Sequence, residues 1–190
     1  MNEEFIMQMR PWLGEEEREA VNSYMLTDGF LTEFKKSEEF ENEISIFTGS
    51  KHCILVNNGT ISLSLAALAL GIGPGDEVIV PNYTMVATPN SVKFIGAEPI
   101  FADVELSSLC LDFNELEKKL TSRTKAVIFV TANGRFPNKD LSDYLKFCNK
   151  NNLYLIEDAA QSFGSFYPDR THIGLKGIVG SFSFSMPKII

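Results

Sequence analysis

The sequence predicts an α/β protein with a mostly parallel β-sheet between helices, and three observations lead to this prediction. Short apolar runs alternate with helical segments over most of the chain. The runs themselves are apolar, which is typical of parallel strands covered on both faces. Glycine and proline gather at the boundaries, as in residues 71–76, where one helix ends and the next strand begins.

The elements are expected in a regular order. Two amphipathic helices open the chain at residues 15–24 and 33–47, around the turn Thr27-Asp28-Gly29. Strands are expected at 53–57, 77–81, 99–104, 126–131, 153–158 and 181–185. Helices are expected between them at 62–70, 86–95, 114–120 and 141–151. The chain thus divides into an N-terminal helical segment (1–50) and a sheet domain (51–190). Ligands of such sheets bind beyond the carboxyl ends of the strands.

Composition narrows the class of protein. A length of 190 residues suits one domain, and a net charge of −8 argues against a general nucleic-acid or anionic-membrane surface. Cys53, Cys110 and Cys148 are widely spaced in a chain with two histidines, so neither a disulfide framework nor a metal site is expected. Residues 1–10 lack the basic start of a signal peptide, and no apolar stretch approaches the ~20 residues of a membrane span. We therefore expect a cytoplasmic protein with three plain thiols.

Lys188 and Asp158 suggest a site for pyridoxal phosphate (PLP). Asp158 ends a buried strand, and Lys188 follows a later strand rich in Ser and Phe. The cofactor's aldehyde needs an amine for a Schiff base, and its pyridine nitrogen needs an anion to hold a proton. Glu157 and Asp158 point to opposite faces of the strand, so only one can serve the site. Taken singly, Lys188 could be a solvated lysine and Asp158 the cap of a following helix.

Three further positions suit the same ligand. Gly59 and Thr60 open a helix after the first strand, where a close backbone, unpaired N–H groups and a hydroxyl favour a phosphate. The alternative for Thr60 is a simple helix N-cap. Gln161 could donate to the ring's phenolate oxygen or be solvated. Ser183 shares one strand face with Ser181 and Ser185, which could offer a hydroxyl to phosphate or form a small packing surface.

Met85 lies in the segment 81–88, which leads into a helix beside the predicted phosphate loop. Side chains from this segment could cover one face of a flat ring. By default, however, a methionine here is expected in the core, because methionine readily fills gaps there.

Taken in order, six blocks resemble the DegT/DnrJ/EryC1/StrS family of PLP-dependent nucleotide-sugar aminotransferases. The likeness runs from about Arg10 to the end of the chain. The blocks are Asn58-Gly59-Thr60, residues 70–81, residues 121–127, residues 156–161, Ser181-Phe182-Ser183-Phe184 and Lys188. The resemblance implies the large domain of a type I PLP-transferase, the aspartate aminotransferase-like fold.

The resemblance also implies roles for these residues. Lys188 would form the Schiff base and shuttle protons, Asp158 would pair with the pyridine nitrogen, and Gln161 would contact the ring hydroxyl oxygen. The phosphate would be held by Gly59, Thr60 and Ser183. The position of Met85 usually carries an aromatic residue that stacks on the ring, so methionine is a departure from the family. Arg135 stands within the stretch Asn133-Gly134-Arg135-Phe136-Pro137, where many members have Tyr-Gly-x-Pro.

The implied reaction moves an amino group from glutamate to the cofactor, leaving pyridoxamine phosphate, and then to a nucleotide-linked 4-keto-6-deoxy sugar. Residues 83–90 look most like enzymes that make perosamine-type amino sugars for surface polysaccharides such as the O-antigen of lipopolysaccharide. Lys188 argues against a dehydratase branch of the family that has histidine there.

Family members are about twice this length. The resemblance implies that a strand after the lysine, inserted between strands 53–57 and 181–185, and a smaller C-terminal domain are missing here. We therefore expect an N-terminal half that acts as a homodimer or with a complementing chain. Two alternatives stay open: another type I PLP enzyme such as a lyase, and a non-catalytic relic or interaction module that pairs with a full-length homologue.

Overall fold

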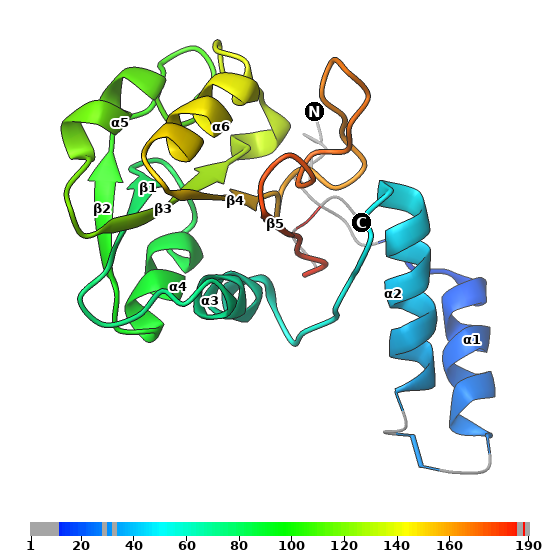
Figure 1. Ribbon diagram of the computed structural model, residues 1–190. Helices are drawn as coiled ribbons and strands as arrows, with labels where there is room; N and C mark the ends of the chain where they lie inside the picture. The colour runs from blue at the N-terminus through cyan, green and yellow to red at the C-terminus, as the bar shows by residue number, and fades with distance from the viewer. Residues whose placement is uncertain (1–11, 28–29, 32–33, 186–187, 189–190) are drawn as a thin grey trace, which may run out of the picture. The chain divides into compact units, whose positions relative to one another are not determined.

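The computed structural model describes residues 12–27, 30–31, 34–185 and 188. It forms two compact units, one made of the chain up to residue 55 together with residues from 185 onward, the other of residues 56–184. Each unit is described by itself (Figure 1). The expected absence of a signal peptide in residues 1–10 and part of the expected turn at 27–29 lie outside the described residues.

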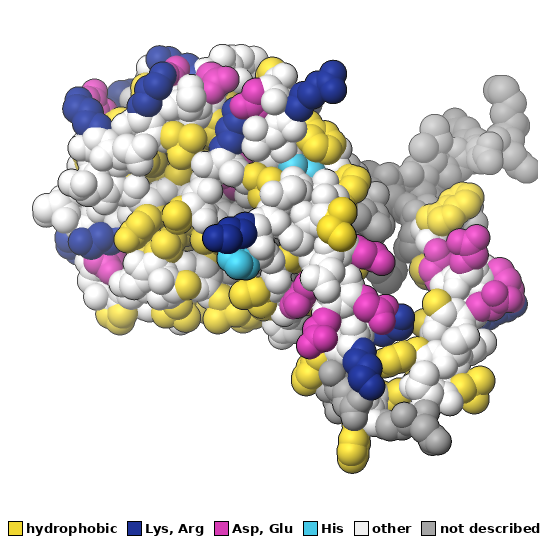
Figure 2. Space-filling model, turned by 45° about the vertical axis from the view of Figure 1, so that its right-hand side comes forward, with side chains coloured by type: hydrophobic (Ala, Val, Ile, Leu, Met, Phe, Trp, Pro, Cys, Tyr) yellow, Lys and Arg dark blue, Asp and Glu magenta, His cyan; other side chains and the backbone are white. Residues whose placement is uncertain are grey.

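Two helices form the first unit, α1 (Glu15–Met25) and α2 (Lys35–Thr48), close to their expected bounds. Helix α1 begins with three glutamates, whose negative charges are stabilised by the positive N-terminal end of the helix dipole. Glu17 also accepts a hydrogen bond of 2.7 Å from the backbone N–H of Gly14. Acidic side chains gather along both helices (Figure 2). Within the described part of the chain, no helix combines the length and the apolar character needed to cross a bilayer.

The expected strand at 53–57 is wrong, because the structure assigns these residues no strand pairing. A strand needs a neighbouring backbone to satisfy its N–H and C=O groups. Here the backbone N–H of Leu55 instead donates to the Glu41 carboxylate at 2.6 Å. Ile54 is 80% exposed, so this apolar run is not covered as a buried strand would be.

Five parallel strands form the sheet of the second unit, in the order β2-β1-β3-β4-β5. Their bounds are β1 (Glu77–Pro81), β2 (Glu98–Ala102), β3 (Thr124–Val130), β4 (Tyr154–Asp158) and β5 (Val179–Ser181). Helices α3 (Gly59–Ala69) and α4 (Ala87–Phe94) cover one face, and α5 (Phe113–Lys119) and α6 (Leu141–Lys150) the other (Figure 1). The predicted α/β class and parallel sheet are thus confirmed.

The predicted strand at 181–185 is wrong in its bounds, since β5 begins and ends earlier. The register pairs Asp158 with Ser181, the last residue of each strand. Beyond Asp158 the chain turns, and the backbone N–H of Ala159 closes the ladder with a hydrogen bond of 2.9 Å to the Ser181 carbonyl. Residues 182–185 therefore have no partner strand in β4 to pair with.

Two apolar clusters lie on opposite faces of the sheet. Beneath α3 and α4 the core is built from small and β-branched residues, and beneath α5 and α6 it is larger and aromatic. All three cysteines carry free thiols, and Cys110 and Cys148 are buried in the second cluster. Burial raises the pKa of the Cys148 thiol to about 12 and also raises the pKa of Cys110.

The loop between β4 and β5 packs tightly enough to require glycine. An added Cβ at Gly180 would lie 2.0 Å from the carbonyl oxygen of Gly174, and one at Gly177 would lie 2.6 Å from that of Leu155. Gly174 itself has φ of +95°, a conformation that favours glycine. Backbone thus approaches backbone here, where side chains would normally intervene.

His172 in this loop predicts a stability that falls in mild acid. Its Nδ1–H donates to the Ile173 carbonyl at 2.5 Å, and its Nε2 accepts the Gly164 N–H at 3.0 Å, so the ring is held neutral. Burial lowers its pKa below the usual 6.5. The imidazole of His172 therefore takes up a proton more readily in the unfolded chain than in the folded one. Above pH 6.5 the ring is neutral in both states and its full contribution to stability is present. This contribution is lost as the pH falls from 6.5 through the pKa of the folded state.

Thermal unfolding at pH 7.5 and 5.5 checks this prediction. We expect His172→Gln to reduce the loss of stability between the two pH values, while the matched change at the exposed His52, His52→Gln, leaves it as in the parent chain. An equal loss in His172→Gln and the parent chain would contradict it.

Candidate active site

The predicted site residues of the second unit lie around the carboxyl ends of β1, β3, β4 and β5. In the strand order β2-β1-β3-β4-β5, the chain leaves β1 through α4 on one face and β3 through α6 on the other, and ligands of such sheets bind at a point of this kind. Asp158 ends β4, the segment 82–86 follows β1, and the short 3₁₀ helix η1 (Ala132–Gly134) follows β3. Parallel pairing therefore brings together segments that are far apart in the sequence.

Asp158 is the buried acid of this edge, with 6% of its surface exposed. Its Oδ2 accepts a hydrogen bond of 2.7 Å from the Thr88 hydroxyl in α4, and its Oδ1 accepts one of 3.3 Å from the Ala160 N–H. The alternative of a helix cap is wrong, because turns rather than a helix follow Asp158. Two donors instead hold a carboxylate at the end of a central strand.

Glu157 lies on the other face of β4, as predicted. Its carboxylate accepts hydrogen bonds from the Tyr167 hydroxyl at 2.6 Å and from the backbone N–H groups of Gly174 at 2.9 Å and Gly177 at 2.5 Å. All three donors belong to the loop that leads to β5. Glu157 therefore serves the loop and Asp158 the carboxyl edge.

Gln161 is fixed by the backbone of η1. The backbone N–H of Asn133 donates to Gln161 Oε1 at 2.7 Å. A backbone N–H can only donate, so the amide oxygen must face it and the NH₂ group must point the other way. Asn133 presents this N–H from a left-handed conformation with φ of 53°, which asparagine tolerates well, and its side chain reaches the Tyr83 hydroxyl at 3.3 Å.

The start of α3 has the features of a phosphate site. Asn58, not Thr60, is the N-cap, because its side chain accepts the Ile61 N–H at 2.9 Å; the capping alternative for Thr60 is therefore wrong. Thr60 is the second helical residue, within the turn whose N–H groups lack intrahelical partners. An added Cβ at Gly59 would lie 3.3 Å from the Cβ of Ser183. Glycine thus lets the segment that follows β5 come close to the helix start.

The serine face of the β5 region lies against α3. The Ser181 hydroxyl donates to Ser62 in α3 at 2.9 Å, which is a packing contact. Ser183 lies beyond the strand, against Gly59. Phe182, on the opposite face of this segment, packs against the core and lies edge-on to Phe163 at a centroid distance of 5.4 Å.

The default interpretation of Met85 as a core residue is wrong, because its side chain is 64% exposed. Its neighbours Tyr83 and Val86 are 46% and 60% exposed. The segment between β1 and α4 therefore presents apolar side chains to solvent at the carboxyl edge, where a flat ligand could use them.

Lys188 and Arg135 were also singled out from the sequence. Lys188 belongs to the first unit, where its backbone N–H donates to the Ser185 carbonyl at 2.9 Å, so its catalytic role stays a prediction. Arg135 has an exposed side chain, and its carbonyl accepts a hydrogen bond of 3.4 Å from the Cys110 thiol.

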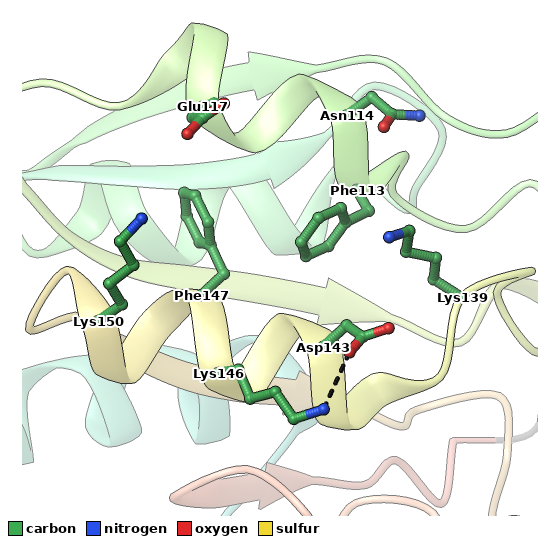
Figure 3. A pocket seen from close by; sticks show the side chains of 8 residues that line it. All are labelled: Phe113, Asn114, Glu117, Lys139, Asp143, Lys146, Phe147 and Lys150. Atoms are coloured by element: carbon green, nitrogen blue, oxygen red, sulfur yellow. Dashed lines mark hydrogen bonds and ion pairs between the residues drawn. The ribbon is translucent and has the colours of Figure 1, made fainter.

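A cavity of about 390 Å³ lies elsewhere, between α5 and α6 (Figure 3). Figure 3 shows Phe113 and Phe147 at its floor, with Lys146 paired to Asp143 at 3.1 Å. None of its lining residues is a predicted site residue, so this cavity is no part of the candidate site.

Two contributors were missed from the sequence, Thr88 and Asn133. Thr88 lies 70 residues from Asp158, and nothing in the local pattern joins them. Asn133-Gly134 was available as a turn signal, because both residues tolerate positive φ, but it did not indicate a contact to Gln161.

The fold and the site together define the class of protein, since the same architecture occurs in solved aminotransferases. An aminotransferase from Psychrobacter cryohalolentis superposes with a TM-score of 0.88 at 35% identity, covering 96% of this chain and 46% of that one. The sugar aminotransferase Spr1654 from Streptococcus pneumoniae, solved in a PLP form, gives 0.87 at 27% identity, covering 96% of this chain and 50% of that one.

The chain belongs to the DegT/DnrJ/EryC1/StrS aminotransferase family, whose model matches residues 11–190. Among curated relatives, a GDP-perosamine synthase from Caulobacter vibrioides is 40% identical over 95% of this chain and 48% of its own length. The chain spans about half the length of the curated relatives it matches. The family resemblance inferred from the sequence is confirmed.

Proposed function

We propose that this chain supplies the PLP site of an aminotransferase acting on nucleotide-linked sugars. The observation that carries the proposal is the Asp158 carboxylate, buried at the end of β4 and held by Thr88 and the Ala160 N–H. A fixed anion at this position suits a protonated pyridine nitrogen. When bound, the cofactor would act as an electron sink for the carbon that gains or loses the amino group.

The remaining residues fit the other parts of the cofactor. Gln161, with its oxygen taken by the Asn133 N–H, would donate its NH₂ group to the ring's anionic oxygen. The first turn of α3, with Gly59 and Thr60, would bind the phosphate together with Ser183, the N–H and hydroxyl groups donating to its oxygens. The exposed Met85 would cover one face of the ring through its thioether.

Lys188 would supply the amine. In this proposal its Nζ would be the amine that holds the cofactor, and once free it would take up and return a proton at the carbon that bears the amino group. Glutamate would be the amino donor, and a nucleotide-linked 4-keto-6-deoxy sugar of the perosamine type the acceptor. We place the reaction in the cytoplasm, in the supply of amino sugars for surface polysaccharides.

We further propose that the chain acts as a homodimer or with a chain that carries the second half of the relatives' sequence. The match spans nearly all of this chain but about half the length of its relatives. Substrate screening should therefore include GDP-linked keto-sugars, with and without that second half.

Borohydride trapping tests the cofactor site directly. The 190-residue chain is incubated with PLP, reduced with borohydride, digested and mapped by mass spectrometry. We expect a dominant pyridoxyl group on Lys188, absent from Lys188→Arg and retained in the control Lys176→Arg, whose lysine is paired to Asp169 at 2.8 Å. Modification spread over surface lysines such as Lys150, with none favoured, would contradict the proposal.

A further inference from the structure

We propose that Thr88 is a positioning residue, whose hydroxyl holds the Asp158 carboxylate in one orientation and favours its charged form. The inference rests on the proposed function, because the Thr88–Asp158 contact would serve to keep a proton on the ring nitrogen of bound PLP. Thr88 would not touch the reacting atoms. It would act through Asp158 alone.

The contact is short and shielded from water. Thr88 Oγ1 lies 2.7 Å from Asp158 Oδ2, and the exposed fractions of the two residues are 0% and 6%. A hydrogen bond to an ionised group is stronger than a neutral one, and a buried environment of low dielectric strengthens it further. Thr88 therefore stabilises the carboxylate more than a solvated hydroxyl could.

The direction of the protons follows from a second contact. Thr84 Oγ1 lies 2.7 Å from Thr88 Oγ1, and each hydroxyl has one proton to donate. An ionised carboxylate only accepts, so the Thr88 proton points to Asp158 and the Thr84 proton to Thr88. The chain of hydroxyls from Thr84 to Thr88 to Asp158 is thus polarised toward the acid, and each bond strengthens the next.

A buried serine of α3 connects that helix to α4, and a second serine bonds within α4. The Ser91 hydroxyl donates to the Thr88 carbonyl at 2.7 Å, and the Ser64 hydroxyl in α3 donates to the Ser91 carbonyl at 3.0 Å. Helix α3 carries the proposed phosphate site at its start. A series of hydrogen bonds therefore connects the helix that would bind phosphate with the acid that would bind the ring nitrogen.

The test uses pyridoxine 5′-phosphate, which has an alcohol in place of the aldehyde and so reports binding without Lys188 chemistry. Thr88→Val keeps the shape of the side chain but removes the hydroxyl. We expect about tenfold weaker binding, the size of one charged hydrogen bond. In nitrogen-15 NMR, the ring resonance should move toward the unprotonated position. Thr88→Ser should restore both properties.

Thr124→Val is the matched control, since it makes the same change at a buried threonine that begins β3, at the other end of the strands from Asp158, where its hydroxyl accepts the Thr121 N–H at 2.9 Å. It should lower stability but leave the ring nitrogen resonance unchanged. Thr88→Ala, which removes the same hydroxyl, replaces Thr88→Val if the latter does not fold.

Each outcome decides the inference. Binding and nitrogen resonance in Thr88→Val that equal those of the parent chain would overturn it and leave the proposed function intact. In an Asp158→Asn background, Thr88→Val should have no further effect; a further tenfold loss would show that Thr88 acts through packing. A parent chain that does not bind pyridoxine 5′-phosphate would overturn the proposed function and this inference together.

Discussion

Replacing Asp158 by asparagine is expected to weaken PLP binding by about ten- to a hundredfold while the fold survives, since a hydrogen bond to a charged partner contributes about 1.5–3 kcal/mol. Asparagine has nearly the same shape, and its oxygen can still accept the Thr88 hydroxyl that lies 2.7 Å from the carboxylate. What it lacks is the negative charge that would keep the pyridine nitrogen protonated. Without that charge the ring withdraws electrons poorly, so amino transfer should fall further than binding.

Equilibrium titration with PLP, followed by absorbance, measures this loss, and thermal unfolding of the same samples checks the fold. A suitable control is Asp112→Asn, which changes the N-cap of α5 and has no part in the site. It should bind PLP as the parent chain does. Unchanged PLP binding in Asp158→Asn would argue that the acid is only structural.

Replacing the neighbouring Glu157 by alanine is expected to affect the fold instead of the cofactor site. We expect the free energy of unfolding to fall by about 3–5 kcal/mol. Three donors, two of them buried, would lose their acceptor: the Tyr167 hydroxyl and the backbone N–H groups of Gly174 and Gly177. Tyr167 cannot relieve the loss by ionising, because burial raises the pKa of its hydroxyl. The loop between β4 and β5 should therefore loosen first.

Chemical denaturation of Glu157→Gln and Glu157→Ala gives a graded measure. The amide oxygen of glutamine can still accept from Tyr167 and Gly174, but its NH₂ group would face the Gly177 N–H, so we expect an intermediate loss. A loss in Glu157→Ala no larger than that of a surface substitution, about 0.5 kcal/mol, would contradict the assignment.

Much of the sheet could be predicted from the sequence, because buried parallel strands are apolar and bounded by turn residues. The strands that end at Pro81 and Asp158 were expected with those ends. The alternation of side chains along a strand also predicted correctly that Glu157 and Asp158 face opposite ways. Strand ends and side-chain alternation are local properties, because the two-residue period of a strand and the turn residues beside it lie within a few residues of each other.

The errors concern pairing and exposure, which depend on distant parts of the chain. Residues 53–57 have the composition of a strand but no neighbouring strand, and the Glu41 side chain occupies the Leu55 N–H. Met85 is apolar and yet 64% exposed, which no local pattern indicates. Thr88 could not be assigned to Asp158 because threonine near a helix start is common, and only the fold brings the two together.

The state of the thiols has a practical consequence for anyone who wishes to attach a reporter to this protein. Two of the three cysteines are buried in the apolar cluster, and burial keeps them protonated and unreactive at neutral pH. Cys53 is only partly buried and lies in the segment before α3, outside the sheet. Partial burial also raises the pKa of the Cys53 thiol, so a maleimide dye should label this one partly exposed cysteine faster as the pH rises, without engineered cysteines.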